Sequence, residues 1–461
     1  MTATATEQDV AGRVLDLVKA AAGAGVEAEV LVERQELALT RFANSYIHQN
    51  VADATTAVRL RLHADGRTAS TSTTVLESLD DLVERTVAAL RLAPADPSWP
   101  GLTPATPSAL TGHHDDATAV AEPDERAARV RAFVDAAGGL ATAGFCSTSS
   151  TTAAFANSAG QAVQASSTQA TMDAIARTPT SDGLIRLAGV RLADLDGAVL
   201  GARAAAKARA GADPVELAPG RYEVVLEPTA VADVLQILAL YGFNAKAVAE
   251  RRSFVELGAA QFDRSITIVD DMTAPDAMGT PFDAEGTPRQ TLRLVDAGVS
   301  TTVAHDRRTA AKAGTESTGH AIVGGGAWGA APAAVRLLPG SPETPSEVDG
   351  PAADSTVAAL VAGVERGLLV TDNHYTRVLD PRTLVVTGLT RNGVWLIEQG
   401  EITTPVKNFR FTQSYPQALA PDAVLGVGAH ATGLPAVWSE AGIHAPALRL
   451  ASWNYTGGAS G

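Results

Sequence analysis

Hydrophobic positions in the first half of the chain recur at helical spacing in some stretches and alternate in others. Over residues 7–22, Val10, Val14 and Val18 fall on one face, which is typical of an amphipathic helix. Ser78 is placed to cap a second helix. Further helices are expected over 78–92, 123–137 and 194–210. Strands are expected over 28–32, 37–42, 56–63, 68–75, 145–155 and 162–174.

The second half of the chain is richer in strand patterns. Pro228 opens one helix that we expect to run to about residue 242. Residues Arg391-Asn392-Gly393 and Gln399-Gly400 have the composition of hairpin turns, so the end of the chain is predicted to be a meander. The expected strands are 222–226, 265–269, 291–294, 300–304, 368–370, 384–389, 394–398, 401–404 and 409–412.

Three stretches lack a regular pattern and divide the chain. Residues 94–121 are rich in Pro, Thr, Ser and Asp and are predicted to be a long exposed connection, and 314–354 to be a long functional or covering loop. Residues 211–220 resemble a domain linker. The predicted class is therefore α+β with two domains: an N-terminal α/β domain, 1–210, with a curved antiparallel sheet, and a β-rich C-terminal domain with a meander, 221–461.

Composition narrows the function. The 461 residues carry 36 Lys and Arg against 51 Asp and Glu, a net charge of −15, and 46% are hydrophobic, which indicates a folded globular protein. The acidic balance argues against nucleic acid and anionic membrane surfaces as partners. One cysteine, Cys146, excludes an intrachain disulfide and a multi-cysteine metal site. Neither a secretory signal nor an 18-residue apolar stretch is visible, so we expect a soluble cytoplasmic protein.

Motifs of common enzyme classes are absent or weak. The chain has no His-Glu-x-x-His helix and no Gly-x-Ser-x-Gly turn. Residues 324–329 satisfy Gly-x-Gly-x-x-Gly literally, but Pro332 leaves too little room for the helix that a dinucleotide site needs, so a glycine-rich loop is favoured. His113-His114-Asp115-Asp116 is favoured as a surface cluster over a metal site. Ser147–Ser150 beside Cys146 is favoured as a strand edge with a buried thiol over a nucleophile cluster.

Several segments, in the same order and spread over nearly the whole chain, resemble the TldD/PmbA family, in which TldD and TldE (PmbA) are related subunits of a metalloprotease. Each segment alone is a weak signal. The matching segments are Thr40–Asn50, Phe155–Gly160, Ser253–Phe254, Ile268–Asp271, Phe282–Pro288, Thr387–Gly393, Ile397–Ile402 and Pro405–Phe411.

The resemblance also implies where a zinc site would be. TldD-type chains carry His-Glu-x-x-x-His on the helix before the Ser-Phe segment, and counting back from Ser253 places the two His and the Glu near Gln236, Tyr241 and Ile237. None of these residues supplies an imidazole or a carboxylate. The family's later cysteine segment resembles Gly426–His430, which has no cysteine. One candidate ligand, His430, cannot hold a catalytic zinc; Asn244 and His430 are expected to line the family's internal channel.

By this resemblance the chain is a TldE/PmbA-type subunit without a cofactor of its own. Its expected partner is a TldD-type zinc-bearing subunit, and the heterodimer would admit unfolded or leader peptides for proteolysis. Two alternatives stay open. One is a subunit of a biosynthetic peptide or amide hydrolase in a natural-product pathway. The other is a non-enzymatic homodimeric binding or regulatory protein of the kind labelled gyrase modulators.

Overall fold

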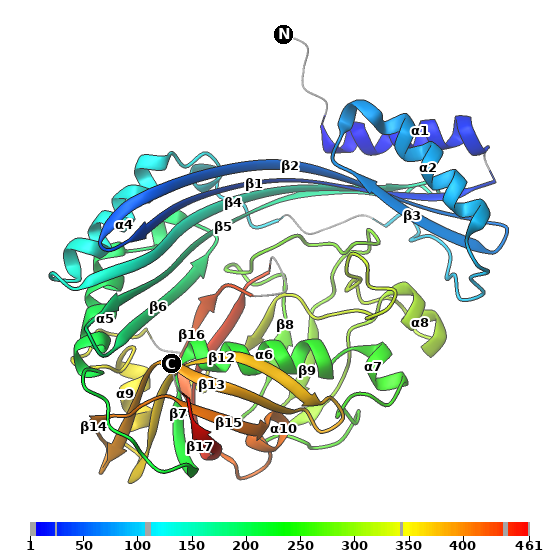
Figure 1. The fold of residues 1–461 in the computed structure, drawn as a ribbon. Coiled ribbons are helices and arrows are strands. Elements are labelled where there is room, and N and C mark those ends of the chain that lie inside the picture. The colour runs from blue at the N-terminus through cyan, green and yellow to red at the C-terminus, as the bar shows by residue number, and fades with distance from the viewer. Residues whose placement is uncertain (1–5, 24, 107–111, 342–343, 437–440, 460–461) are drawn as a thin grey trace.

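The computed structural model describes residues 6–23, 25–106, 112–341, 344–436 and 441–459. It contains two sheets with helices, so the predicted α+β class is confirmed. Figure 1 shows the first sheet arching over a second, strand-rich unit. The predicted domain boundary at 211–220 stays a prediction; the first sheet ends at Gly189 and the second begins at Gly220.

The N-terminal sheet is antiparallel throughout and has the order β3-β2-β1-β4-β5-β6. The two strands predicted at 28–32 and 37–42 are one continuous strand, β1, because the polar stretch between them stays paired on both sides. Its strands are β1 (Glu27–Ala43), β2 (Tyr46–Ala64), β3 (Arg67–Thr73), β4 (Ala141–Asn157), β5 (Ala162–Arg177) and β6 (Asp182–Gly189).

Helices cover one face of this sheet. Val30 and Val32 of β1 pack with Val14 of α1 and Leu82 of α2 in one apolar core, and a second core forms around Phe42 under α4 and α5. Ser78 lies at the N-cap position of α2 as predicted, but its side chain makes no capping hydrogen bond, and a short 3-10 turn, Leu76–Ser78, leads into the helix. The helices are α1 (Glu7–Ala22), α2 (Leu79–Leu92), α3 (Asp116–Ala119), α4 (Pro123–Ala136) and α5 (Gly197–Ala210), with a second 3-10 turn at Leu192–Asp194.

The C-terminal unit is built on an 11-stranded mixed sheet with the order β10-β9-β8-β11-β17-β15-β13-β12-β7, to which β14 and β16 are added at β13 and β17. A further pairing of β17 with β7 closes five of these strands into a ring. The strands are β7 (Gly220–Leu226), β8 (Ile268–Asp270), β9 (Leu292–Asp296), β10 (Val299–Ser300), β11 (Val335–Leu337), β12 (Arg366–Asp380), β13 (Val385–Glu398), β14 (Glu401–Pro405), β15 (Phe409–Ser414), β16 (Val424–Leu434) and β17 (Ile443–Gly458).

The predicted meander is present, but one of the two predicted turns lies inside a strand. Gln399 and Gly400 connect β13 to β14 with φ angles of 52° and 79°, as expected for a tight hairpin. Asn392 and Gly393 instead form an irregularity inside β13, opposite the register shift of β12. Gly393 has a φ of 134°, and a Cβ there would lie 2.2 Å from the Trp395 ring, so glycine is required by the fold and not by a turn.

The connection predicted to be exposed is partly buried. Thr103 is 3% exposed and donates to the Glu285 carbonyl at 2.7 Å, while His113 lies 3.0 Å from the Met272 carbonyl. The segment therefore ties the first sheet to the second unit. Cys146 is buried in the core under α4, in agreement with the prediction of a buried thiol.

The remaining helices belong to the second unit. They are α6 (Pro228–Ile237), α7 (Ala245–Ala249), α8 (Arg307–Ala313), α9 (Ser355–Val361) and α10 (Tyr415–Ala418), with a π-helical turn, Leu238–Gly242, directly after α6. Within the described ranges, no helix has both the length and the apolar character required to cross a bilayer.

Candidate functional site

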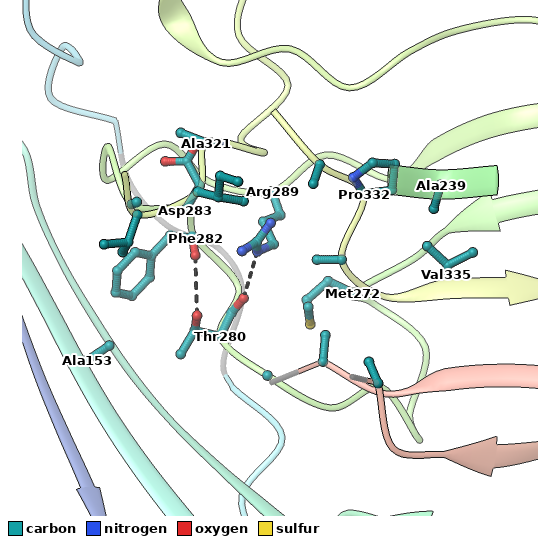
Figure 2. Close-up of a pocket in the computed structure, with 18 of the residues that line it drawn as sticks. Ala153, Ala239, Met272, Thr280, Phe282, Asp283, Arg289, Ala321, Pro332 and Val335 are labelled. Carbon is teal, nitrogen blue, oxygen red and sulfur yellow. Dashed lines mark hydrogen bonds between the residues drawn. The ribbon is translucent and has the colours of Figure 1, made fainter. Parts of the chain in front are cut away.

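A cleft separates the N-terminal sheet from α6 and the loops around it. Its first part is a cavity of about 400 Å³, drawn in Figure 2. A second cavity of about 510 Å³ adjoins it. The residues that line both cavities are Leu31, Arg59, Ala284, Ala321, Ile322 and Val323, so the two form one continuous cleft.

The N-terminal sheet forms one wall of the cleft. Leu31 and Glu33 are two positions apart in β1, so both side chains lie on the face that the helices do not cover. Arg59 of β2 is paired opposite Leu31. Arg59 and Glu33 form an ion pair at partly exposed positions. This wall is therefore apolar at Leu31 and has one ion pair, Arg59 with Glu33, at its margin.

The opposite wall is made by irregular loops that hydrogen bonds hold in place. Asp283 is 2% exposed and accepts from the backbone N–H groups of Ala321, at 2.8 Å, and Glu285 and Thr287, both at 2.9 Å. Burial raises the pKa of Asp283 to about 6, and the nearby Glu285 adds to the rise. Because its oxygens are engaged by backbone donors, Asp283 shapes this wall of the cleft.

Arg289 also holds the loops of this wall together. Its Nε donates to the Thr280 carbonyl at 3.0 Å and its Nη1 to the Gly319 carbonyl at 3.2 Å. Figure 2 shows this guanidinium beside Thr280, whose hydroxyl donates to the Phe282 carbonyl at 3.3 Å. Arg289 also supplies positive charge near Asp283, which opposes the rise in the pKa of that carboxyl.

A buried ion network closes one end of the cleft. Arg307 Nη2 donates to Glu29 at 2.6 Å and Arg307 Nε to Glu285 at 3.1 Å, while Arg61 contacts both carboxylates. Burial raises the pKa of Glu29. For Glu285 burial acts in the same sense, but Arg307 and Arg61 outweigh it and lower its pKa.

Trp99 covers this network. Its ring lies 5.7 Å from the Arg61 guanidinium carbon and 5.4 Å from that of Arg307, and the His63 ring stacks on it. The network joins β1 and β2 to the loops of the second unit, so it links the two walls of the cleft at this end.

The residues at the predicted zinc-helix positions are separated by the fold. Gln236 lines the first cavity, whereas Ile237 is 1% exposed in the apolar core. The single helix predicted to run to about residue 242 ends at Ile237 and continues as the π-helical turn, in which the Phe243 N–H donates to the Leu238 carbonyl at 3.3 Å. Gln236 and Ile237 therefore lie in the regular helix, and Tyr241 lies in the wider π-helical turn.

The Tyr241 ring packs edge-on against Trp328 of the glycine-rich stretch, which forms a loop as predicted. Asn244 caps α7 by accepting from the Lys246 and Ala247 N–H groups and donates to the Trp328 carbonyl at 3.0 Å. Asn244 is 1% exposed, and neither Asn244 nor the half-buried His430 of β16 lines the two cavities. Their assignment to a channel stays a prediction.

The donor set at these positions does not fit a catalytic zinc. Such a site needs three nitrogen, sulfur or carboxylate ligands and an open position, and Gln236, Ile237 and Tyr241 offer an amide, an alkyl chain and a phenol. Across the described part of the chain, no three His, Cys, Asp or Glu side chains gather in a way that could hold a metal ion.

Several cleft residues were not predicted from the sequence. The alternation of 27–43 could have placed Leu31 and Glu33 on one face, but nothing in the sequence pairs that face with the loops at 279–289 and 319–323. These loops have no periodic pattern. Their positions depend on long-range hydrogen bonds, one that the Ala321 N–H donates to Asp283 and one that Arg289 donates to the Gly319 carbonyl.

Comparisons with known proteins agree with this architecture. TldE from Thermococcus kodakarensis superposes with a TM-score of 0.83 over 97% of this chain and 100% of its own, at 17% identity. A candidate modulator of a DNA gyrase from Thermotoga maritima superposes with a TM-score of 0.82 over 98% and 100%, at 20% identity. At these identities the likeness shows the fold.

Sequence comparisons identify the family. An uncharacterized protein of Methanocaldococcus jannaschii is 36% identical over 104 residues, which span 22% of this chain and 25% of that protein. The model of the PmbA/TldA metallopeptidase C-terminal domain matches residues 219–457, and that of PmbA/TldA metallopeptidase domain 1 matches residues 28–90. The chain belongs to the TldD/PmbA metallopeptidase family.

Proposed function

We propose that this chain is the TldE/PmbA-type subunit of a two-chain metalloprotease and that it provides no catalytic zinc ligands. In this proposal a TldD-type partner holds the zinc, and the cleft of this chain completes a chamber for unfolded or leader peptides. The fold shared with TldE of Thermococcus kodakarensis supports the subunit type. The observation that carries the proposal is where the residues at the zinc-helix positions lie. Ile237 lies in the core, and Tyr241 packs against Trp328.

The cleft has properties that suit an extended peptide. Its walls combine apolar side chains, among them Leu31, Phe282 and Met272, with backbone segments of irregular loops. Apolar contacts and main-chain hydrogen bonds bind a peptide with little dependence on its sequence. A cavity pair of about 400 and 510 Å³ has room for several residues of an unfolded chain, whereas a folded domain would not enter.

The first experiment measures zinc and peptide cleavage. We expect the purified chain to hold less than about 0.1 zinc per molecule and to cleave no unstructured fluorogenic peptide. Co-expression with a family member that carries His-Glu-x-x-x-His should yield a 1:1 complex with one zinc and cleavage activity. One tightly bound zinc per isolated chain would contradict the proposal.

A variant pair tests the role of the cleft in that complex. Val323 lines both cavities and is 50% exposed, whereas Val75 is 49% exposed and lies outside them. Val323→Trp should lower cleavage at least tenfold, because the indole narrows the cleft where its two parts meet, and Val75→Trp should leave it unchanged. Equal activity of the two variants in an intact complex would exclude the cleft as the peptide site.

The substrate profile of the complex separates general peptide turnover from the biosynthetic alternative, since a dedicated enzyme would cleave one leader peptide or amide and leave unrelated peptides intact. If no zinc-bearing chain co-purifies and the isolated chain binds peptides without cleaving them, the non-enzymatic regulatory alternative is favoured. The Thermotoga maritima relative is described as a gyrase modulator. The net charge of −15 of the present chain does not favour direct contact with DNA.

A further inference from the structure

The charged side chains that line the described cleft all have partners within the chain. At its margin, Arg59 forms an ion pair with Glu33. In the opposite wall, Asp283 accepts from three backbone N–H groups, and Arg289 donates to two backbone carbonyls. A guanidinium or carboxylate that is engaged in this way is not free to bind a charge on a ligand.

The buried network at the end of the cleft is balanced in charge. Arg61 contacts Glu29 and Glu285, and Arg307 binds the same two carboxylates. Two guanidinium groups therefore face two carboxylates. Glu29 and Glu285 are 3% and 7% exposed, so neither can turn toward a ligand without leaving an unpaired charge inside the protein.

The two other charged residues of the second cavity are engaged as well. Arg308 donates from both Nη atoms to the Asp96 carboxylate, at 2.7 and 2.8 Å. Asp306 accepts from the N–H and the hydroxyl of Thr309, both at 2.7 Å. Although the chain has a net charge of −15, the cleft thus offers an unpaired charge of neither sign among the residues that the structure describes.

A charged peptide side chain would therefore bind poorly in this cleft. It would lose hydration on entry and would find no free counter-charge among these described residues. It could gain a partner only by breaking one of the pairs, and the other member of that pair would then be left uncompensated. The penalty applies to Lys and Arg as well as to Asp and Glu, so the cleft disfavours charge of both signs.

The two cavities differ in the neutral side chains that they present. The first is lined mainly by apolar residues, and Figure 2 shows Met272 and Val335 at this cavity. In the second, Ser70 and Ser72 of β3 are exposed and lie two positions apart on one face of the strand. The backbone of the glycine-rich loop, Gly324–Gly326, lines the same cavity. Because a hydroxyl both donates and accepts hydrogen bonds, the second cavity suits small polar residues.

We propose that the cleft selects uncharged peptide segments, in which apolar residues occupy the first cavity and Ser, Thr or Gly residues occupy the second. Apolar side chains gain free energy by leaving water in the first cavity. Small polar residues exchange hydrogen bonds with Ser70, Ser72 and the glycine backbone in the second. Within this class the cleft tolerates many sequences, because charge is the property that it discriminates by. The inference rests on the proposed function in taking a peptide as the ligand.

Isothermal titration calorimetry with the full chain tests this selection. The host peptide has an apolar half and a Ser/Gly half and is capped at both ends, so that it carries no charge. Placing Lys or Asp at the junction of the halves brings the charge to Arg59, which lines both cavities. We expect each substitution to raise the dissociation constant at least about tenfold. A charged peptide that binds as tightly as the host, or a host that does not bind at about 1 mM, would overturn the proposal.

Removing one member of the marginal ion pair should switch the preference. Arg59→Gln leaves Glu33 without its cation, so the Lys peptide should gain at least about tenfold in affinity relative to the Asp peptide. Glu33→Gln should favour the Asp peptide by a similar factor. Glu398→Gln breaks an exposed pair with Arg366 outside both cavities and should leave the three affinities unchanged. Thermal unfolding checks that each variant is folded. Folded Arg59→Gln and Glu33→Gln chains that discriminate like the wild type would contradict the role given to paired charges.

A cleavage assay separates this proposal from the proposed function. We expect a zinc-bearing complex to cleave the host peptide at least about tenfold faster than the Lys and Asp peptides. Equal cleavage of the three peptides would overturn the selection and leave the proposed function intact. If no zinc-bearing complex forms while the isolated chain still prefers the host peptide, the selection holds and the proposed function fails.

Discussion

The Tyr241 ring meets the Trp328 indole edge-on, with centroids 5.2 Å apart and planes at 84°. Two further side chains act on the same loop: Asn244 donates to the Trp328 carbonyl, and Lys246 Nζ donates to the carbonyls of Gly326, at 2.7 Å, and Ala327, at 2.8 Å. The segment that follows α6 thus holds the glycine-rich loop, and the loop in turn lines the second cavity.

Removing the Tyr241 ring should loosen that loop. Tyr241→Ala is expected to lower the free energy of unfolding by about 2 kcal/mol, since it loses an aromatic contact and part-buried area. Hydrogen exchange over residues 323–329 should accelerate, whereas Tyr241→Phe, which keeps the ring, should behave like the wild type. Unchanged exchange in Tyr241→Ala would show that Asn244 and Lys246 hold the loop without it.

Substitution of Arg307 should lower the free energy of unfolding more than substitution of most other charged residues. Arg307→Met leaves Glu29 and Glu285 sharing Arg61 in a buried site, and losing one partner of such a network costs about 3–5 kcal/mol. Arg293→Met breaks an exposed pair with Asp296 and should cost less than about 1 kcal/mol. Urea unfolding of both variants measures the difference. Similar losses would mean that the network does not fix the end of the cleft.

Local patterns in the sequence predicted helices, strands and turns, but not how these elements pack against one another. The spacing of Val10, Val14 and Val18 and the turn at Gln399-Gly400 are local signals, and both predictions are confirmed. Asn392-Gly393 has the same turn composition, yet close packing with Trp395 makes it an irregularity within a strand.

The cleft could not be predicted for a related reason. It exists because Leu31 and Phe155 of the first sheet pack with Phe282 of a loop more than a hundred residues away. That loop has no hydrophobic period, and its conformation is set by hydrogen bonds that the backbone N–H groups of Glu285 and Thr287 donate to Asp283. The resemblance located the zinc-helix positions, but the burial of Ile237 in the core and the packing of Tyr241 on Trp328 are visible only in the structure.

Asp233 should make stability depend on pH. Burial raises the pKa of Asp233 to about 7, although the hydroxyls of Tyr415, at 2.6 Å, and Thr376, at 2.9 Å, donate to it. Between its ordinary value of 3.8 and about 7 the folded state binds a proton that the unfolded state does not. Stability therefore falls as pH rises through this window, by up to about 1.4 kcal/mol per pH unit.

Asp233→Asn isolates this contribution, because the neutral amide does not titrate. Urea unfolding at pH 5, 6 and 7 should show a smaller fall in stability for Asp233→Asn than for the wild type. Asp16→Asn, at an exposed position of α1, should leave the wild-type slope intact. Parallel slopes for all three proteins would assign the titration to other buried carboxyls, such as Asp372, whose pKa burial raises to about 6.

A carboxylate should destabilise the fold much more at Ile237 than at the neighbouring Gln236 of α6. Gln236 lies at the cavity, so Gln236→Glu keeps the side-chain shape at a hydrated site and should cost less than about 1 kcal/mol. Ile237→Glu buries a carboxyl in the apolar core and should cost more than about 3 kcal/mol, with Ile237→Met as the tolerated control of similar volume. Thermal unfolding compares the three. A stable Ile237→Glu chain would mean that α6 can turn this position toward the cleft, and the argument against a zinc site here would then fail.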